Sequence, residues 1–142
     1  MYDTPAWYPD DPATCLALAN GIVVVHLAIV GFLILGEALI LLGGWRRWRW
    51  VGNRWLRGAH LSTILFVAVQ ATLDRVCPLT LWEHDLRARA GQPIEDAGFI
   101  ARLLRELLYV DASPAVLTAC YVAFAALVVA TIWMVPVRWK GR

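Results

Sequence analysis

QATLDRVCPLT, residues 70–80, is where a long hydrophobic run ends, and this stretch decides how the rest of the chain is divided. Asp74 and Arg75 close the run, and Pro78 follows shortly after them. Because proline lacks the N–H that continues a helix, we expect one helix to end near residue 75. Thr80 and Glu83 have the spacing of a capping box, which predicts that a new helix starts at Thr80.

The composition indicates a membrane protein. Of the 142 residues, 60% are hydrophobic and only 17% are charged, whereas soluble domains have about 25% charged residues. The mean hydropathy of +0.59 agrees with this class. The net charge of +2 is too small to favour a nucleic-acid partner, so none is expected.

Three stretches could cross a membrane, which needs about 20 apolar residues. The second is marginal in length and contains His60, Gln70 and Asp74, so a soluble core helix is the alternative for it. We expect spans at residues 14–43, 56–75 and 114–136 within a single membrane domain, residues 1–142. Asp11-Pro12 and Ser113-Pro114 are typical helix starts before the first and third spans. The first span follows acidic residues and has no small-residue cleavage site, so we expect it to be retained rather than removed as a signal peptide.

Basic residues favour one orientation of these spans, because short loops rich in Lys and Arg stay in the cytoplasm. The loop after the first span and the C-terminus are both basic; the residues are Arg46, Arg47, Arg49, Arg54, Arg57, Arg138, Lys140 and Arg142. The N-terminal segment carries only acids. The sequence therefore predicts a periplasmic N-terminus, a cytoplasmic C-terminus and a multi-pass protein of the bacterial inner membrane.

The segment between the second and third spans predicts two periplasmic helices, at about residues 80–90 and 96–109. Gly91 has the character of a left-handed stop after the first of them. In the second, apolar residues recur at helical spacing at Phe99, Ile100, Leu103, Leu104, Leu107 and Leu108, and Arg102, Arg105 and Glu106 lie opposite. We interpret this helix as an anchor at the outer membrane surface, with a lid over a site as the alternative. The fold class is thus an all-α membrane protein.

Polar residues within the spans are the main functional candidates, because each needs a partner in hydrocarbon. They are His26, Glu37, His60, Gln70 and Asp74. His60, Thr63, Val67, Gln70 and Asp74 follow a three-four spacing that defines one helical face. From their depths along the helices we expect two interhelical contacts, Glu37 with His60 and His26 with Asp74. Such pairs are either structural or part of a proton path.

The sequence predicts no catalytic residue, no metal site and no cofactor of its own. His26 is a weak candidate for holding a pigment or haem, but antenna helices commonly place a small residue four positions earlier, where this chain has Ile22. Contact with pigments or lipids would come through a partner complex. Cys15 and Cys77 are both expected near the periplasmic face, where a disulfide is conceivable. Cys120 is expected to pack within the third span.

The loop after the first span interleaves tryptophan with arginine. It contains Trp45, Arg46, Arg47, Trp48, Arg49, Trp50 and Trp55. An aromatic belt at the membrane interface explains these positions, and Trp133 and Trp139 would complete it. The alternative is docking onto anionic lipids or onto a larger complex through Trp and Arg anchors.

Four segments resemble a family of small bacterial inner-membrane proteins known only as a domain of unknown function: HLAIVGFLILG (26–36), RGAHLSTILF (57–66), CPLTLWEHDLRARAG (77–91) and GFIARLLRELLY (98–109). The most specific motif is Cys77, Pro78 and Thr80 with the following Glu83. The resemblance covers roughly residues 20–135. It implies a helical membrane fold and gives importance to these residues, His26 and His60, without an activity.

Two functions remain open. The first, which we favour, is a non-catalytic accessory or assembly subunit of a larger integral-membrane complex, either photosynthetic or respiratory, in contact with membrane lipids. The second is a small stand-alone membrane enzyme or proton-linked carrier that uses the intramembrane His and carboxylate pairs.

Overall fold

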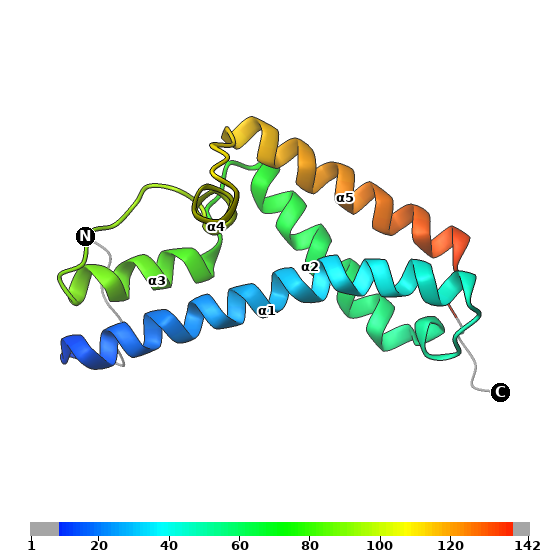
Figure 1. Ribbon diagram of the computed structural model, residues 1–142, viewed down its shortest axis with the longest axis horizontal. Coiled ribbons are helices and arrows are strands. Elements are labelled where there is room, and N and C mark those ends of the chain that lie inside the picture. Colours follow the sequence, from blue (N-terminus) through cyan, green and yellow to red (C-terminus); the bar gives the residue numbers. More distant parts are fainter. Residues whose placement is uncertain (1–8, 138–142) are drawn as a thin grey trace. The chain divides into compact units, whose positions relative to one another are not determined.

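The computed structural model describes residues 9–137, and these form helices and no strand (Figure 1). In chain order the elements are α1 (Pro12–Trp45), the short 3-10 helix η1 (Trp50–Gly52), α2 (Arg54–Thr72), α3 (Pro78–Arg89), α4 (Phe99–Leu108) and α5 (Pro114–Met134). The chain divides into two compact units, one up to Ala28 with Val76–Asp111 and one of Ile29–Arg75 with the residues from Ala112 on.

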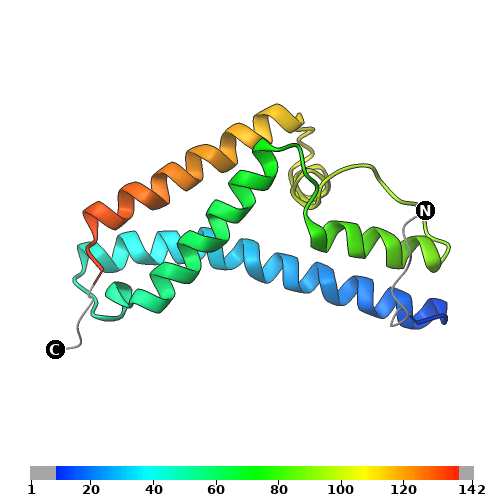
Figure 2. The ribbon, with the colours of Figure 1, turned by 180° about the vertical axis from the view of Figure 1, so that it is seen from behind.

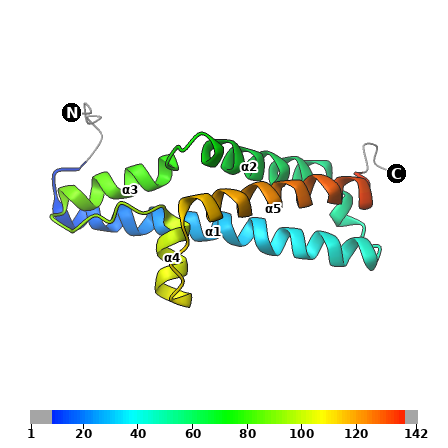
Figure 3. The same cartoon turned by 90° about the horizontal axis from the view of Figure 1, so that it is seen from above.

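The first unit combines the first half of α1 with α3 and α4. Cys15 and Ala19 of α1 pack against Leu86 of α3, and all three are almost fully buried. α3 runs along α1, whereas α4 runs across it (Figure 3). The small Cys15 and Ala19 side chains leave room for Leu86 of α3, and this contact forms the core of the unit.

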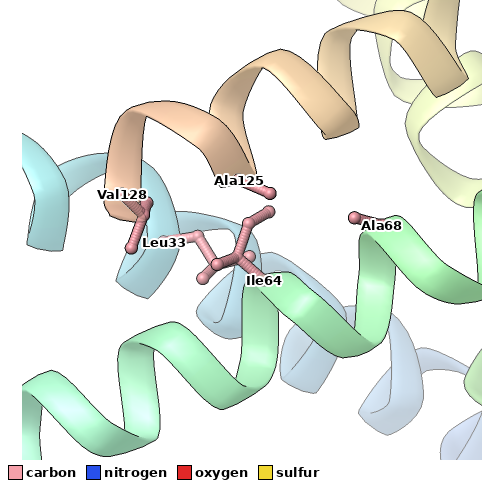
Figure 4. Packing of buried hydrophobic residues seen from close by; sticks show 5 residues of the cluster. All are labelled: Leu33, Ile64, Ala68, Ala125 and Val128. Atoms are coloured by element: carbon pink, nitrogen blue, oxygen red, sulfur yellow. The ribbon is translucent and has the colours of Figure 1, made fainter. Parts of the chain in front are cut away.

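The second unit combines the second half of α1 with η1, α2 and α5. Its core consists of Leu33, Ile64, Ala68, Ala125 and Val128, which interdigitate between the three long helices (Figure 4). α2 and α5 are antiparallel: the Thr118 hydroxyl donates to the Ala71 carbonyl near one end, and the Arg57 guanidinium donates to the Val135 carbonyl near the other. The end of α1, the start of α2 and the end of α5 therefore meet at one end of this unit (Figure 2).

The helix termini confirm three of the predicted signals. Asp11 caps α1 by accepting from the Thr14 N–H at 2.9 Å, and Ser113 caps α5 by accepting from the Val116 N–H at 3.4 Å. The Thr14 hydroxyl and N–H both bind the Asp11 carboxylate and lower its pKa. Gly91 has a φ of 72° and ends α3 with a Gln92 N–H to Arg87 carbonyl bond of 2.9 Å, a Schellman turn.

The predicted capping box at Thr80 and Glu83 is wrong. α3 begins two residues earlier, with Pro78 in its first turn and Cys77 at the N-cap position. Proline fits the first helical turn because the N–H it lacks would have no partner there. Thr80 therefore lies inside the helix, and Glu83 is free to bind other groups.

In the part of the chain that the structure describes, two helices are long and apolar enough to cross a membrane. They are α1, with 34 residues and a mean hydropathy of 2.5 in its best window, and α5, with 21 residues and a value of 2.3. α1 begins two residues before the expected span at 14–43 and ends two residues after it, and α5 ends two residues before the expected end of the span at 114–136. The third expected span, 56–75, corresponds to α2, which forms a helix of 19 residues but is not among the helices that meet these criteria.

The faces of two helices differ from the expected ones. On α2 the buried positions are Arg57, His60, Ile64 and Ala68, so the buried face diverges from the predicted polar face after His60. On α4, Arg102 does not face away from the protein but contacts Glu83 of α3. Leu107 and Leu108, at the end of α4, are instead exposed. Contacts with other helices determine which face of each helix is buried, and the spacing of apolar residues within one helix does not reveal those contacts.

Candidate functional site

A buried polar cluster joins all three long helices of the second unit. It consists of Glu37 from α1, His60 from α2 and Thr131 from α5, whose exposed fractions are 2%, 1% and 0%. Polar groups so deeply buried are costly unless they find partners. The partners they have, and those they lack, determine what the cluster can do.

His60 is held against the backbone of α1. Its Nε2 lies 2.9 Å from the Leu33 carbonyl oxygen, and because a carbonyl can only accept, Nε2 carries a hydrogen. Gly36 makes this approach possible, since a Cβ at that position would lie 3.1 Å from His60 Cδ2 and 3.2 Å from Nε2. The Phe32 ring packs edge-on against the imidazole at 5.3 Å. The ring orientation and the proton on Nε2 are thereby fixed.

The remaining imidazole nitrogen faces Glu37. His60 Nδ1 lies 3.8 Å from Glu37 Oε2, an ion-pair distance that is too long for a hydrogen bond. Glu37 Oε2 is buried and has no hydrogen-bond partner among the described residues. The structure therefore brings together Glu37 and His60, one of the two pairs expected from the sequence.

Thr131 completes the carboxyl environment. Its hydroxyl contacts Glu37 Oε1 and also lies 2.8 Å from the Leu127 carbonyl oxygen in the preceding turn of α5. A hydroxyl has one hydrogen to donate, so it cannot donate to both acceptors at once. The proton on Thr131 thus has two alternative acceptors.

Arg57 supplies a fixed positive charge near this cluster. It is only 4% exposed, and its guanidinium donates to the Val135 carbonyl at 3.3 Å, beyond the last turn of α5. Arg57 and Glu37 interact through their charges although they form no direct ion pair. An arginine stays charged in proteins, so its charge partly balances a carboxylate at Glu37.

The first unit contains a second buried polar cluster, centred on Glu83. Its carboxylate has no exposed surface and accepts from Arg102 at 3.1 and 2.6 Å and from Arg87 Nε at 2.9 Å. Burial alone would raise the pKa of Glu83, but the hydrogen bonds and charges of Arg102 and Arg87 outweigh it and lower the pKa. Glu83 therefore joins α3 to α4 as an ionised, fully bonded group.

Arg87 extends this cluster to two further segments. Its other guanidinium nitrogens donate to Gln92, just past the Gly91 turn, at 3.0 Å and to Asn20 of α1 at 3.2 Å. His84, on the same helix, has a buried Nε2 without a partner among the described residues, and burial lowers its pKa. The Glu-x-x-x-Arg spacing in the CPLTLWEHDLRARAG segment places Glu83 and Arg87 one turn apart on α3, where they bond to each other. Glu83 also bonds to α4 and Arg87 to α1.

His26 lies in the first unit and contacts α4. Its ring stacks on Phe99, with centroids 4.1 Å apart and an interplanar angle of 4°. Its Nδ1 is buried and has no hydrogen-bond partner among the described residues. Asp74 is exposed and belongs to the other unit, as does the half-buried Gln70, so the expected pairing of His26 with Asp74 stays a prediction.

The tryptophans of the second unit lie at its end where α1, α2 and α5 meet. Trp45, Trp55 and Trp133 are 80%, 76% and 85% exposed. Trp48 and Trp50 stack on each other at 6.0 Å, and Arg54 lies over the Trp55 ring at 5.6 Å. Arg46, Arg47 and Arg49 are exposed beside them. Arg138, Trp139, Lys140 and Arg142 lie outside the described residues.

The three cysteines are free thiols. Cys15 is buried, Cys77 is half-buried and Cys120 is exposed on α5. Cys15 Sγ lies 3.2 Å from the Pro9 carbonyl oxygen, which gives the thiol an acceptor. Within residues 9–137, no three His, Cys, Asp or Glu side chains gather as they would to hold a metal ion.

Sequence reasoning missed three contributors to the second-unit cluster. Thr131 resembled any threonine in an apolar helix, and Arg57 was counted only as part of the basic loop. Gly36 had a usable signal, because it directly precedes the only acid of the first apolar run, and glycine often marks a close approach between helices.

Comparison with known proteins identifies one family. The model of the family described as "Protein of Unknown function (DUF2784)" matches residues 16–137. This range covers both buried polar clusters and the Trp-Arg segment. No curated protein and no solved structure matches the chain significantly.

Proposed function

The chain belongs to the DUF2784 family of proteins of unknown function, and we propose that it is a non-catalytic accessory or assembly subunit of a larger bacterial membrane complex. Photosynthetic and respiratory complexes both fit this role. The proposal rests on the tryptophan-rich end of the second unit and on the long apolar helices α1 and α5.

The proposed topology has three spans, α1, α2 and α5, with the N-terminus in the periplasm and α3 and α4 on that side of the inner membrane. α2 is the least apolar of the three. Its most polar groups support a span nonetheless, because Arg57 and His60 are buried against α1 and α5 rather than exposed. Five arginines in the segment from Trp45 to Arg57 favour a cytoplasmic position for this end.

The observation that carries the docking proposal is the exposure of three tryptophans at one end of the unit. Trp45, Trp55 and Trp133 each leave more than three quarters of their surface uncovered. Tryptophan and arginine are the residues most enriched at energetic centres of protein interfaces. Arg46, Arg47 and Arg49 add positive charge next to them, so the partner surface should be acidic and partly apolar.

The test is affinity purification of the natively expressed chain in mild detergent. The wild type should retain a stoichiometric set of integral-membrane proteins, and the visible absorption of that set would identify a pigment or haem complex. Each anchoring tryptophan contributes about 2 kcal/mol or more, so Trp45→Ala with Trp55→Ala should weaken binding about 1,000-fold.

Trp82→Ala is the matched control, because Trp82 is 47% exposed but lies on α3 in the first unit. It should retain every partner. If the double variant also retained its partners in full, the docking proposal would fail, and the aromatic belt at the lipid interface would account for the tryptophans.

A second candidate function, a proton-linked carrier or small membrane enzyme, is favoured by one specific observation. Glu37 and His60 place a carboxyl and an imidazole 3.8 Å apart in a buried site, with one atom of the carboxyl lacking a hydrogen-bond partner among the described residues. Two apolar side chains at these positions would stabilise the fold better, because the desolvation free energy of a buried charged pair often exceeds its electrostatic attraction.

A further inference from the structure

We propose that Glu37 and His60 form a reversible binding site for one proton, held between Glu37 Oε2 and His60 Nδ1. This inference goes beyond the docking proposal and does not depend on it. It deepens the second candidate function by naming the bound species and the two atoms that hold it.

The first step is the fixed state of His60. Its Nε2 hydrogen is committed to the Leu33 carbonyl at 2.9 Å, so only Nδ1 can gain or lose a proton without breaking this bond. In the neutral ring, Nδ1 presents a lone pair to Glu37 Oε2 at 3.8 Å. Two acceptor atoms facing each other in a buried site repel, and a proton on either of them turns this repulsion into attraction.

The second step is the ability of Thr131 to serve both protonation states. When Glu37 is a carboxylate, the Thr131 hydroxyl donates to Glu37 Oε1. When the added proton lies between Glu37 Oε2 and His60 Nδ1, it neutralises much of the carboxylate charge, and the Thr131 hydrogen can turn to the Leu127 carbonyl at 2.8 Å. Thr131 serves both states by turning its hydroxyl, and no helix has to move.

The third step is the charge balance around the pair. Within residues 9–137, the charged and titratable groups that interact with Glu37 are His60 and Arg57, both from α2, and the described part of α5 contributes the uncharged Thr131. Arg57 and a Glu37 carboxylate together have a net charge of zero. Uptake of the proton brings the cluster to plus one, so both states stay within one charge of neutrality.

The experiment uses the full-length protein in lipid nanodiscs with ¹⁵N-labelled histidine. The Nδ1 chemical shift of His60 is followed between about pH 4 and pH 10, a range that spans ordinary carboxyl and imidazole titrations. In the wild type, Nδ1 should take up one proton while the Nε2 hydrogen stays bonded. In Glu37→Gln, the proton affinity of His60 should fall about tenfold or more, because the opposite charge is lost.

Glu95→Gln is the control, since this exposed carboxylate lies in the other unit and should leave the His60 midpoint unchanged. Trp45→Ala with Trp55→Ala should also titrate like the wild type, which separates this site from docking. A His60 that never gains the proton, or that titrates equally in Glu37→Gln, overturns the proposal.

Thr131→Val provides a second decision if Glu37→Gln fails to fold. This variant keeps both titrating groups and removes only the hydroxyl. Without the Thr131 hydrogen bond, the Glu37 carboxylate should hold the shared proton more tightly, so the midpoint of the His60 Nδ1 shift should move to higher pH than in the wild type. An unchanged midpoint, or no change of the Nδ1 shift with pH in either protein, overturns the proposal.

Discussion

Gly36→Ala tests whether the buried cluster depends on a close approach between α1 and the His60 ring. The new Cβ would lie 3.1 Å from His60 Cδ2 and 3.2 Å from Nε2, so the ring must retreat by a few tenths of an ångström. The ring has little freedom to do so, because the Leu33 carbonyl holds it at 2.9 Å and Phe32 packs against it. Overpacking of this kind costs about 1–3 kcal/mol.

The gain in helix propensity opposes this cost. Replacing a helical glycine by alanine contributes up to about 1 kcal/mol when nothing is crowded. Gly36→Ala should therefore lower the free energy of unfolding by between about 0 and 3 kcal/mol. Gly31→Ala is the matched control on the same helix, since a Cβ there meets nothing within 4 Å. It should be neutral or stabilising.

The assay is unfolding in mixed micelles at increasing dodecyl sulfate, followed by far-ultraviolet circular dichroism, together with the ¹⁵N shift of His60 Nε2. Gly36→Ala should be less stable than Gly31→Ala by about 1–3 kcal/mol, and only Gly36→Ala should weaken the Nε2 hydrogen bond. Equal stability of the two variants with an unchanged Nε2 shift would refute the close-approach argument.

Two further substitutions probe the first unit. Glu83→Gln should destabilise the protein by about 3 kcal/mol, because Arg102 and Arg87 lose a fully buried carboxylate, measured by the same micelle unfolding. The pKa of Glu83 is lowered from 4.5, so its contribution to the free energy of unfolding is complete above pH 4.5 and is lost as the pH falls through the lowered pKa. Glu83→Gln should lack this loss of stability in acid. An identical dependence of stability on pH in the two proteins would contradict the prediction. Gly91→Ala should lower the free energy of unfolding by about 1–2 kcal/mol, because the backbone φ at this position is 72°. Gly98→Ala is the control and should be close to neutral, since φ is −60° there and a Cβ would meet no neighbouring atom. Equal effects of the two substitutions would show that the α3 turn is not strained.

The helix termini were the most predictable part of the fold. Asp11, Ser113 and Gly91 act on neighbours within five residues, so the local sequence contains everything that determines them. The misplaced start of α3 has a different origin. Both Pro78 and Thr80 are good local start signals, and Glu83, which a capping box would bind to the helix start, is instead buried against Arg102, 19 residues away.

The buried clusters were only partly predictable, because they depend on contacts between distant helices. Glu37 and His60 could be paired from their depths along two helices, since each is costly in an apolar run. Thr131 follows Glu37 by 94 residues, and nothing in its own neighbourhood indicates a carboxyl partner. Arg57 was hidden by its basic neighbours, which are exposed while Arg57 is buried.

The three-way bonding of Arg87 has a consequence for how the protein is made. Arg87 follows its Asn20 partner by 67 residues and binds Gln92 only after the Gly91 turn has formed. During synthesis, the first half of α1 is therefore made well before its α3 partner, and their contact forms only once that turn has left the ribosome. In the proposed topology, a helix of 34 residues with a mean hydropathy of 2.5 is long and apolar enough to stay in the bilayer during this interval. A lysine at position 87 would carry its three N–H donors on one nitrogen, whereas the planar guanidinium of Arg87 directs separate nitrogens to Glu83, Gln92 and Asn20. Arginine at this position therefore ties closure of the first unit to formation of the Gly91 turn.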